Sequence, residues 1–193
     1  IGDASTSEGI FWETMNAAAV MQVPLAVSVW DDGYGISVPK ELQTAKGNIS
    51  EALAGFQQLG TEDKGINIYK AKAWDYPALV KLYTEAVQEM RKTHRPSLFH
   101  IEEVTQPQGH STSGSHERYK STERLAWELE FDCIKIMGEW LTRNKLLNKE
   151  DIEHLKAEAR TFVRSERNAA WENYQAPMKK LRDELLTILE NEP

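Results

Sequence analysis

The first two-thirds of the chain alternates between segments with helical spacing of apolar residues and short apolar runs typical of strands. Residues 9–21, rich in Ala and Met, and residues 76–92 predict helices. Residues 25–30, 66–71 and 98–104 predict strands, and the first run is apolar enough to indicate burial on both faces. Strands that alternate with helices predict a parallel sheet with right-handed crossovers, which is an α/β fold.

The last third of the chain predicts helices alone, over residues 121–143 and 148–190. Asn148 is expected to cap the second helix, because two acidic residues follow in its first turn. Pro177 is expected to kink or split that helix, since proline removes a backbone donor. In the earlier part of the chain, Asp75 is the expected cap of the helix that starts at residue 76.

Composition and charge argue against several classes of function. The 193 residues include 23 Lys and Arg against 30 Asp and Glu, and this net charge of −7 does not suit a nucleic-acid surface. Cys133 is the single cysteine, so we expect no internal disulfide and a cytoplasmic location. The longest apolar run, residues 23–30, is far shorter than the ~20 residues that cross a bilayer. The chain begins at Ile1 and not at a methionine, and we expect it to be a piece of a longer protein.

Residues 2–9, Gly-Asp-Ala-Ser-Thr-Ser-Glu-Gly, lie directly before the first predicted helix. Small residues at a helix start leave backbone N–H groups free to bind an anion. Asp3 could then share a divalent cation with a phosphate group. The alternative is a plain capping loop, in which Ser5 or Ser7 caps the helix and Asp3 lies in a turn.

Residues 30–35, Trp-Asp-Asp-Gly-Tyr-Gly, follow the first predicted strand, where ligands of parallel sheets bind. Consecutive carboxylates point to opposite sides of extended backbone, so one can face a metal while the other bonds to the backbone. Gly33 and Gly35 permit a tight turn that brings a carbonyl, such as that of Tyr34, close to a ligand. The alternative is an ordinary Asp-Gly turn.

Residues 106–116 have no apolar periodicity and predict a loop, in which His110 could donate to a phosphate or move a proton. The alternative is a polar loop with two solvent-exposed histidines, His110 and His116. His100 is expected in the core of a strand. The cysteine and histidine residues lack zinc spacing, so Cys133 is expected to be a small buried hydrophobic residue.

Together, these segments resemble the alpha subunit of thiamine-diphosphate-dependent 2-oxo acid dehydrogenases, the E1 component of the pyruvate and branched-chain complexes. Gly2-Asp3-Ala4 stands where the family's cofactor motif opens with Gly-Asp-Gly, and Asp31-Asp32 where it closes with Asn-Asn. Residues 33–39 are similar to the family's Gly-Tyr-Ala-Ile-Ser-x-Pro, and residues 109–113 to its His-Ser-Thr-Ser loop. The ordered spacing of these motifs is far more specific than any one of them.

The resemblance implies that residues 1–145 are the C-terminal part of a thiamine-diphosphate-binding fold, a parallel sheet flanked by helices, and that residues 146–193 are a helical extension or linker. It implies thiamine diphosphate and Mg²⁺ as cofactors. The implied metal ligands are Asp3, Asp32 and the carbonyl of Tyr34.

The same resemblance assigns roles to further residues. Ala4 and Ser5 would offer backbone contacts to the diphosphate, although Ala4 adds a methyl group where the family has glycine. Asp32 replaces an asparagine and adds a negative charge that Mg²⁺ must offset. His110 would approach the diphosphate side of the cofactor and assist reductive acylation of a lipoyl group. Ser111 matches a serine that is phosphorylated in mitochondrial relatives.

The implied activity is oxidative decarboxylation of a 2-oxo acid, with acyl transfer to the lipoyl domain of E2. The implied assembly is a homo- or hetero-oligomer with an E1 beta subunit or a fused beta domain, which holds the glutamate that activates the thiamine ring. Without that part, this piece alone is expected to be inactive. Two alternatives remain: another thiamine-diphosphate enzyme of the transketolase or acetoin dehydrogenase type, and a non-catalytic assembly module with an eroded site.

Overall fold

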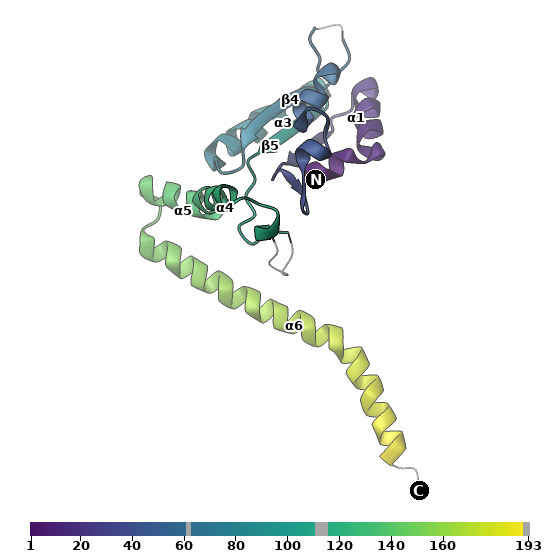
Figure 1. Ribbon diagram of the computed structural model, residues 1–193, viewed down its shortest axis with the longest axis vertical. Coiled ribbons are helices and arrows are strands. Elements are labelled where there is room, and N and C mark those ends of the chain that lie inside the picture. The colour runs from purple at the N-terminus through teal and green to yellow at the C-terminus, as the bar shows by residue number, and fades with distance from the viewer. Residues whose placement is uncertain (61–62, 111–115, 191–193) are drawn as a thin grey trace. The chain divides into compact units, whose positions relative to one another are not determined.

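A computed structural model describes residues 1–60, 63–110 and 116–190. Contacts between residues divide the chain into two compact units, Ile1–Glu139 and Trp140–Pro193. The first unit contains all the strands of the described chain, and the second is helical (Figure 1).

A parallel sheet in the order β1-β5-β4 organises the first unit. Its strands are β1 (Ala26–Trp30), β4 (Asn67–Lys72) and β5 (Ser97–Glu102), so the three predicted strands and the parallel α/β topology are confirmed. The expectation that β1 is buried on both faces is wrong, because Val29 is its one buried residue and Trp30 is 42% exposed. The central strand is β5, which pairs on both sides and is therefore the buried one.

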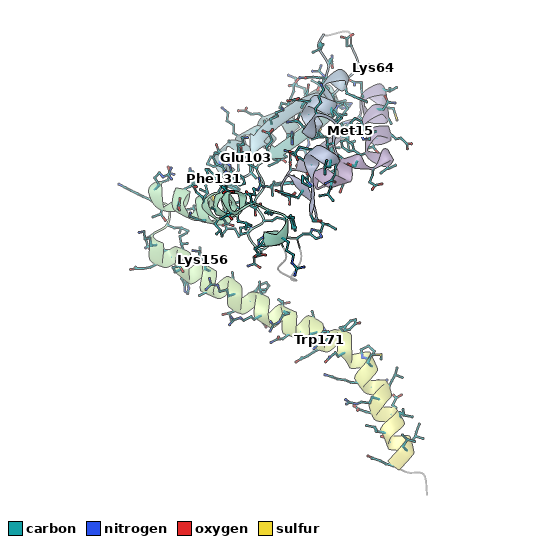
Figure 2. The ribbon with its side chains drawn as sticks, in the orientation of Figure 1. Met15, Lys64, Glu103, Phe131, Lys156 and Trp171 are labelled. Atoms are coloured by element: carbon teal, nitrogen blue, oxygen red, sulfur yellow. The ribbon has the colours of Figure 1, made fainter. Side chains whose placement is uncertain are left out.

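Helices cover both faces of this sheet (Figure 1). Helix α1 (Gly9–Met21) and the short α2 (Ile49–Ala52) pack on one face, around a cluster that includes Met15, labelled in Figure 2, and Leu98 of β5. Helix α3 (Tyr76–Thr93) packs on the other face against Phe99 and Ile101. Because side chains alternate along a strand, His100, two residues after Leu98, lies on the same face of the sheet, toward α2.

The predicted boundaries of α1 and α3 hold to within one residue. Asp75 caps α3 as expected, since its carboxylate accepts the backbone N–H of Ala78 at 3.1 Å. The short elements are η1 (Asp3–Ser7), β2 (Tyr34–Gly35), β3 (Val38–Pro39), η2 (Lys40–Leu42), η3 (Ala45–Gly47), η4 (Ala54–Phe56) and η5 (His116–Arg118).

The segment predicted as one helix over residues 121–143 forms two, α4 (Thr122–Glu130) and α5 (Cys133–Arg143). The break has a local cause, because the Asp132 carboxylate accepts the backbone N–H of Lys135 at 2.7 Å and so starts a new helix.

Helix α6 (Lys149–Glu190) runs for 42 residues and none of its residues is buried. Asn148 caps it as expected, accepting the backbone N–H of Asp151 at 2.9 Å. Pro177 lies inside the helix, which is bent in Figure 1 but not split. Across the described ranges, no helix combines the length and the apolar character needed to cross a membrane.

Candidate cofactor and metal site

Backbone pairing brings Asp3 and the Asp31-Asp32 pair to one edge of the sheet. Asp31 directly follows β1, and its backbone N–H donates to the carbonyl of Ile101 at 2.8 Å. The first residues of the chain pair with the end of the same strand, since Gly2 and Trp30 form a parallel bridge. Asp3 comes next, so its side chain lies beside the turn that follows β1, at the carboxyl edge of the sheet.

The carboxylate of Asp31 is fully bonded within the chain. Its Oδ1 accepts the backbone N–H of Gly33 at 2.8 Å, and its Oδ2 accepts Lys40 Nζ at 2.7 Å and His100 Nε2 at 2.9 Å. Burial acts to raise the pKa of Asp31, but the hydrogen bonds from His100 and Lys40 hold it below its usual value. Asp31 therefore stays ionised with its charge compensated.

Asp3 and Asp32 lack this compensation. Burial, followed by the charges of Asp31 and Asp32, raises the pKa of Asp3 to about 7. Burial also raises the pKa of Asp32, whose Oδ1 accepts the backbone N–H of Tyr34 at 3.2 Å. Within the part of the chain that the structure describes, neither carboxylate forms an ion pair with Lys or Arg. A divalent cation between them would supply the missing positive charge.

The donor set fits Mg²⁺ bound together with phosphate oxygens. Mg²⁺ is usually held by one or two carboxylates and completes its six ligands with phosphate and water. Asp3 and Asp32 supply two carboxylates, and Tyr34 is half-buried on the turn beside them. Among the residues that can be described, no three His, Cys, Asp or Glu side chains are arranged to hold a metal by themselves. The arrangement thus suits a metal ion that binds both the protein and a phosphate group, and not one whose ligands all come from the protein.

A cavity of about 240 Å³ borders the Asp31–Tyr34 turn. It lies among the ends of β1 and β5, the β2–β3 hairpin and helix α4. Its lining residues are mostly charged: Asp31, Asp32, Gly33, Tyr34, Pro39, Lys40, Glu41, Lys72, Glu102, Glu103 and Arg124.

A buried ionic cluster fixes α4 to this turn, and sequence reasoning missed it. Lys120 Nζ lies 2.8 and 3.0 Å from the two carboxylate oxygens of Glu128, which is fully buried. Arg124 donates from Nε to Glu128 at 2.9 Å and from Nη2 to the carbonyl of Asp32 at 2.7 Å. Both cations also lie over the ring of Tyr34, at 5.2 and 5.6 Å from its centre. The spacing of four between Arg124 and Glu128 was the available signal.

The segment before α1 is not a capping loop. No side chain caps α1, whose cap position is Glu8, and Ser7 Oγ instead donates to the carbonyl of Gln43 at 3.1 Å. The interpretation in which Ser5 or Ser7 caps the helix is therefore wrong. The backbone N–H of Ser5 donates to the carbonyl of Gly2 at 3.2 Å, inside the short helix η1, while Ala4 is half-buried.

The predicted loop residues divide between exposed and buried positions. His110 is exposed, and among the described residues no hydrogen bond or ion pair joins it to the aspartates. Ser111 lies outside the described residues. His116 is buried with Nε2 at 3.1 Å from Glu117, so the expectation of two exposed histidines is wrong for it. Cys133 is half-buried against the α3 cluster.

His100 is a core residue, as expected, but it is also a neighbour of the site. Its two ring nitrogens bond to Ser50 Oγ and to Asp31. A polar residue between Phe99 and Ile101, in an apolar run, was the signal that could have indicated this role.

Comparisons with known proteins identify the family of the chain. The family model described as dehydrogenase E1 component matches residues 1–179. The alpha subunit of 3-methyl-2-oxobutanoate dehydrogenase from Mycobacterium tuberculosis is 30% identical over 86% of this chain and 42% of that protein. The mitochondrial 2-oxoisovalerate dehydrogenase subunit alpha 1 of Arabidopsis thaliana is 27% identical, over 97% of this chain and 38% of that protein.

The chain is also similar to a protein that is named for a different substrate. The alpha subunit of acetoin:2,6-dichlorophenolindophenol oxidoreductase from Cupriavidus necator is 25% identical over 84% of this chain and 46% of that protein. The chain thus spans less than half the length of each of these three relatives.

Proposed function

The chain belongs to the dehydrogenase E1 component family, and we propose that it is the part of a branched-chain 2-oxo acid dehydrogenase alpha subunit that holds Mg²⁺ and the diphosphate of thiamine diphosphate. The observation that carries this proposal is the contrast between neighbouring carboxylates. The carboxylate of Asp31 bonds to Lys40 and His100. Asp3 is buried and Asp32 half-buried beside it, and among the described residues neither forms an ion pair with Lys or Arg. The relatives named as 2-oxoisovalerate and 3-methyl-2-oxobutanoate dehydrogenases support the substrate class.

In this proposal the residues of the chain bind and orient the cofactor. Asp3, Asp32 and the carbonyl of Tyr34 bind Mg²⁺, and Ala4 and Ser5 lie against the diphosphate. Thiamine diphosphate, when bound, supplies the carbanion chemistry that decarboxylation of a 2-oxo acid requires. The role of the chain is to place a compensating metal and a rigid turn beside the diphosphate, in a region where burial strengthens every electrostatic interaction.

The remaining assignments concern the larger assembly. We propose that His110, which is exposed in the loop after β5, approaches the diphosphate side of the cofactor during acyl transfer to a lipoyl domain of E2. An E1 beta subunit or fused beta domain completes the site in an oligomer. Residues 1–145 form the cofactor-binding part and residues 146–193 the extension. The lone cysteine and the bacterial relatives favour a cytoplasmic location.

The test is calorimetry on the full-length protein with its beta partner, titrated with thiamine diphosphate in the presence and absence of Mg²⁺. We expect binding only with Mg²⁺, and at least ~10-fold weaker binding for Asp3→Asn and Asp32→Ala. Asp75→Asn is the matched control, because asparagine keeps the cap of α3 and the position lies outside the site.

Binding that does not depend on Mg²⁺, or no binding at all by the wild-type protein, would contradict the proposal and favour an assembly module.

Substrate class is decided by turnover with a lipoyl acceptor. Greater turnover of 3-methyl-2-oxobutanoate than of pyruvate or acetoin is the expected result, and preference for acetoin would place the protein with the oxidoreductase relatives instead.

A further inference from the structure

His100 is the centre of a buried chain of hydrogen bonds that the proposed cofactor contacts do not use. The residue lies on the central strand β5 and is completely buried. Its Nδ1 lies 2.8 Å from Ser50 Oγ in α2, and its Nε2 lies 2.9 Å from Asp31 Oδ2. Lys40 Nζ reaches the same Oδ2 at 2.7 Å from the solvent side. One polar chain therefore links α2, the central strand and the turn after β1.

The direction of the key hydrogen bond follows from the chemistry of the two groups. An ionised carboxylate can only accept, so the proton between His100 and Asp31 belongs to Nε2 of the ring. The second ring nitrogen is engaged by Ser50, which fixes the plane of the imidazole. Because both nitrogens have partners in a closely packed interior, the ring has a single orientation in which it can serve Asp31.

The orientation of Asp31 in turn determines the shape of the turn. Its Oδ1 accepts the backbone N–H of Gly33, which bends the chain directly after the strand. Consecutive side chains on extended backbone point to opposite sides. Holding Asp31 toward β5 therefore turns Asp32 the other way, toward Asp3, and these two are the carboxylates that interact.

We propose that His100 is a positioning residue for the cation site: by fixing the carboxylate of Asp31 it keeps Asp32 facing Asp3. This inference rests on the proposed function, because it assigns His100 a role toward the same Mg²⁺. Replacing a side chain that orients a metal ligand from behind typically weakens metal binding by about 10- to 100-fold. Here the effect acts through the neighbouring carboxylate and the turn that both aspartates share.

Lys40 alone cannot substitute for this contact. Its side chain is 28% exposed and ends in a flexible ammonium group, whereas the imidazole is fully buried and held at both nitrogens. Loss of His100 is therefore expected to weaken metal binding more than loss of Lys40 does.

The experiment measures Mn²⁺ binding by the full-length protein with its beta partner, in the presence of thiamine diphosphate, with free Mn²⁺ quantified by electron paramagnetic resonance. We expect His100→Phe to weaken Mn²⁺ binding by ~10-fold or more. His100→Gln can place an amide N–H near the position of Nε2, and we expect it to stay within ~3-fold of wild type. Lys40→Met is expected to lie between these variants.

Ile101→Val is the matched control. It changes the next buried residue of β5, on the opposite face of the sheet, and should lower the thermal midpoint of unfolding without changing Mn²⁺ affinity. This control separates a general loosening of the strand from loss of the hydrogen bond to Asp31.

The outcomes distinguish failure of the proposed function from failure of the positioning role of His100. Wild-type protein that binds no Mn²⁺ with thiamine diphosphate overturns the proposed function itself. If wild type binds, an unchanged affinity in folded His100→Phe overturns the positioning role, and so does a His100→Gln variant as weak as His100→Phe. Should His100→Phe not fold, Ser50→Ala decides: we expect ~3-fold weaker binding from a loosened ring, and unchanged affinity overturns the inference.

Discussion

Asp3 is only 6% exposed and its carboxyl group lies beside two further carboxylates, so folding disfavours its ionised form. Burial and the charges of Asp31 and Asp32 raise its pKa from 3.8 to about 7. Between these two pH values the folded chain keeps a proton that the unfolded chain has released. The unfolded state then binds fewer protons, and the contribution of Asp3 to the free energy of unfolding falls as pH rises through this window.

Asp3→Asn removes this titration. Since one pKa unit is worth about 1.4 kcal/mol, we expect the metal-free variant to exceed wild type in stability by about 1–3 kcal/mol at pH 8 and to match it near pH 4. Urea unfolding at several pH values measures the difference. Parallel pH profiles for the two proteins would show that Asp3 is not the group responsible, and Asp75→Asn should follow the wild-type profile.

At the same scale, the sequence predicts which two carboxylates meet better than it predicts the groups that hold them in place. The resemblance places Asp3 and Asp32 together, and the structure brings them together at the carboxyl edge of the sheet. The residues alone left this open, because the pairing of Gly2 with Trp30 leaves no periodic pattern in the sequence. The contact of Asp31 with His100 was also beyond prediction, since it depends on the register in which β1 and β5 align.

Helix α4 is joined to the site by charges that are buried and mutually dependent. Glu128 is fully buried between Lys120 and Arg124, and Arg124 also bonds to the backbone of Asp32. Removing one member of such a cluster leaves an unpaired charge in the interior, which costs more than the ion pair itself contributes. The position of α4 against the turn thus depends on Glu128.

Glu128→Leu is therefore expected to lower the free energy of unfolding by about 3–5 kcal/mol, because Lys120 is left buried and unpaired. The double variant Lys120→Met with Glu128→Leu should recover most of this loss. Chemical denaturation of the single and double variants measures the coupling. Glu153→Gln, in the exposed pair with Lys156 on α6, is the control and should cause no measurable change. A double variant as unstable as Glu128→Leu would show that the unpaired charge of Lys120 is not the cause of the loss.

Helices and strands were predicted well where a local pattern determines them, and poorly where their position depends on contacts between distant segments. Helical spacing and the Asp75 cap located α3. The apolar run of β1 suggested burial on both faces, yet β5 is the buried strand, because strand order follows from crossover connections and not from the composition of one strand. The break between α4 and α5 needed the Asp132 cap, which lies within an otherwise continuous helical pattern.

For the molecule as a whole, stability is unevenly distributed along the chain. The sheet of the first unit has a buried apolar cluster on each face. Helix α6 has none, and Figure 2 shows side chains, including Lys156 and Trp171, projecting outward along its length. A helix without a packed face is held by local hydrogen bonds alone, and these open without unfolding the rest of the protein.

Hydrogen exchange on residues 1–193 tests this difference. We expect backbone amides of α6 to exchange at least ~10-fold faster than those of β5, because β5 amides require disruption of the sheet. Exchange should be fastest around residues 173–177, since Pro177 cannot donate to the carbonyl four residues earlier, and Pro177→Ala should slow it. Protection of α6 equal to that of β5 would mean that the helix buries a face within this chain. Rapid exchange here, followed by protection once the beta partner is added, would instead assign the exposed apolar side chains of α6 to the assembly.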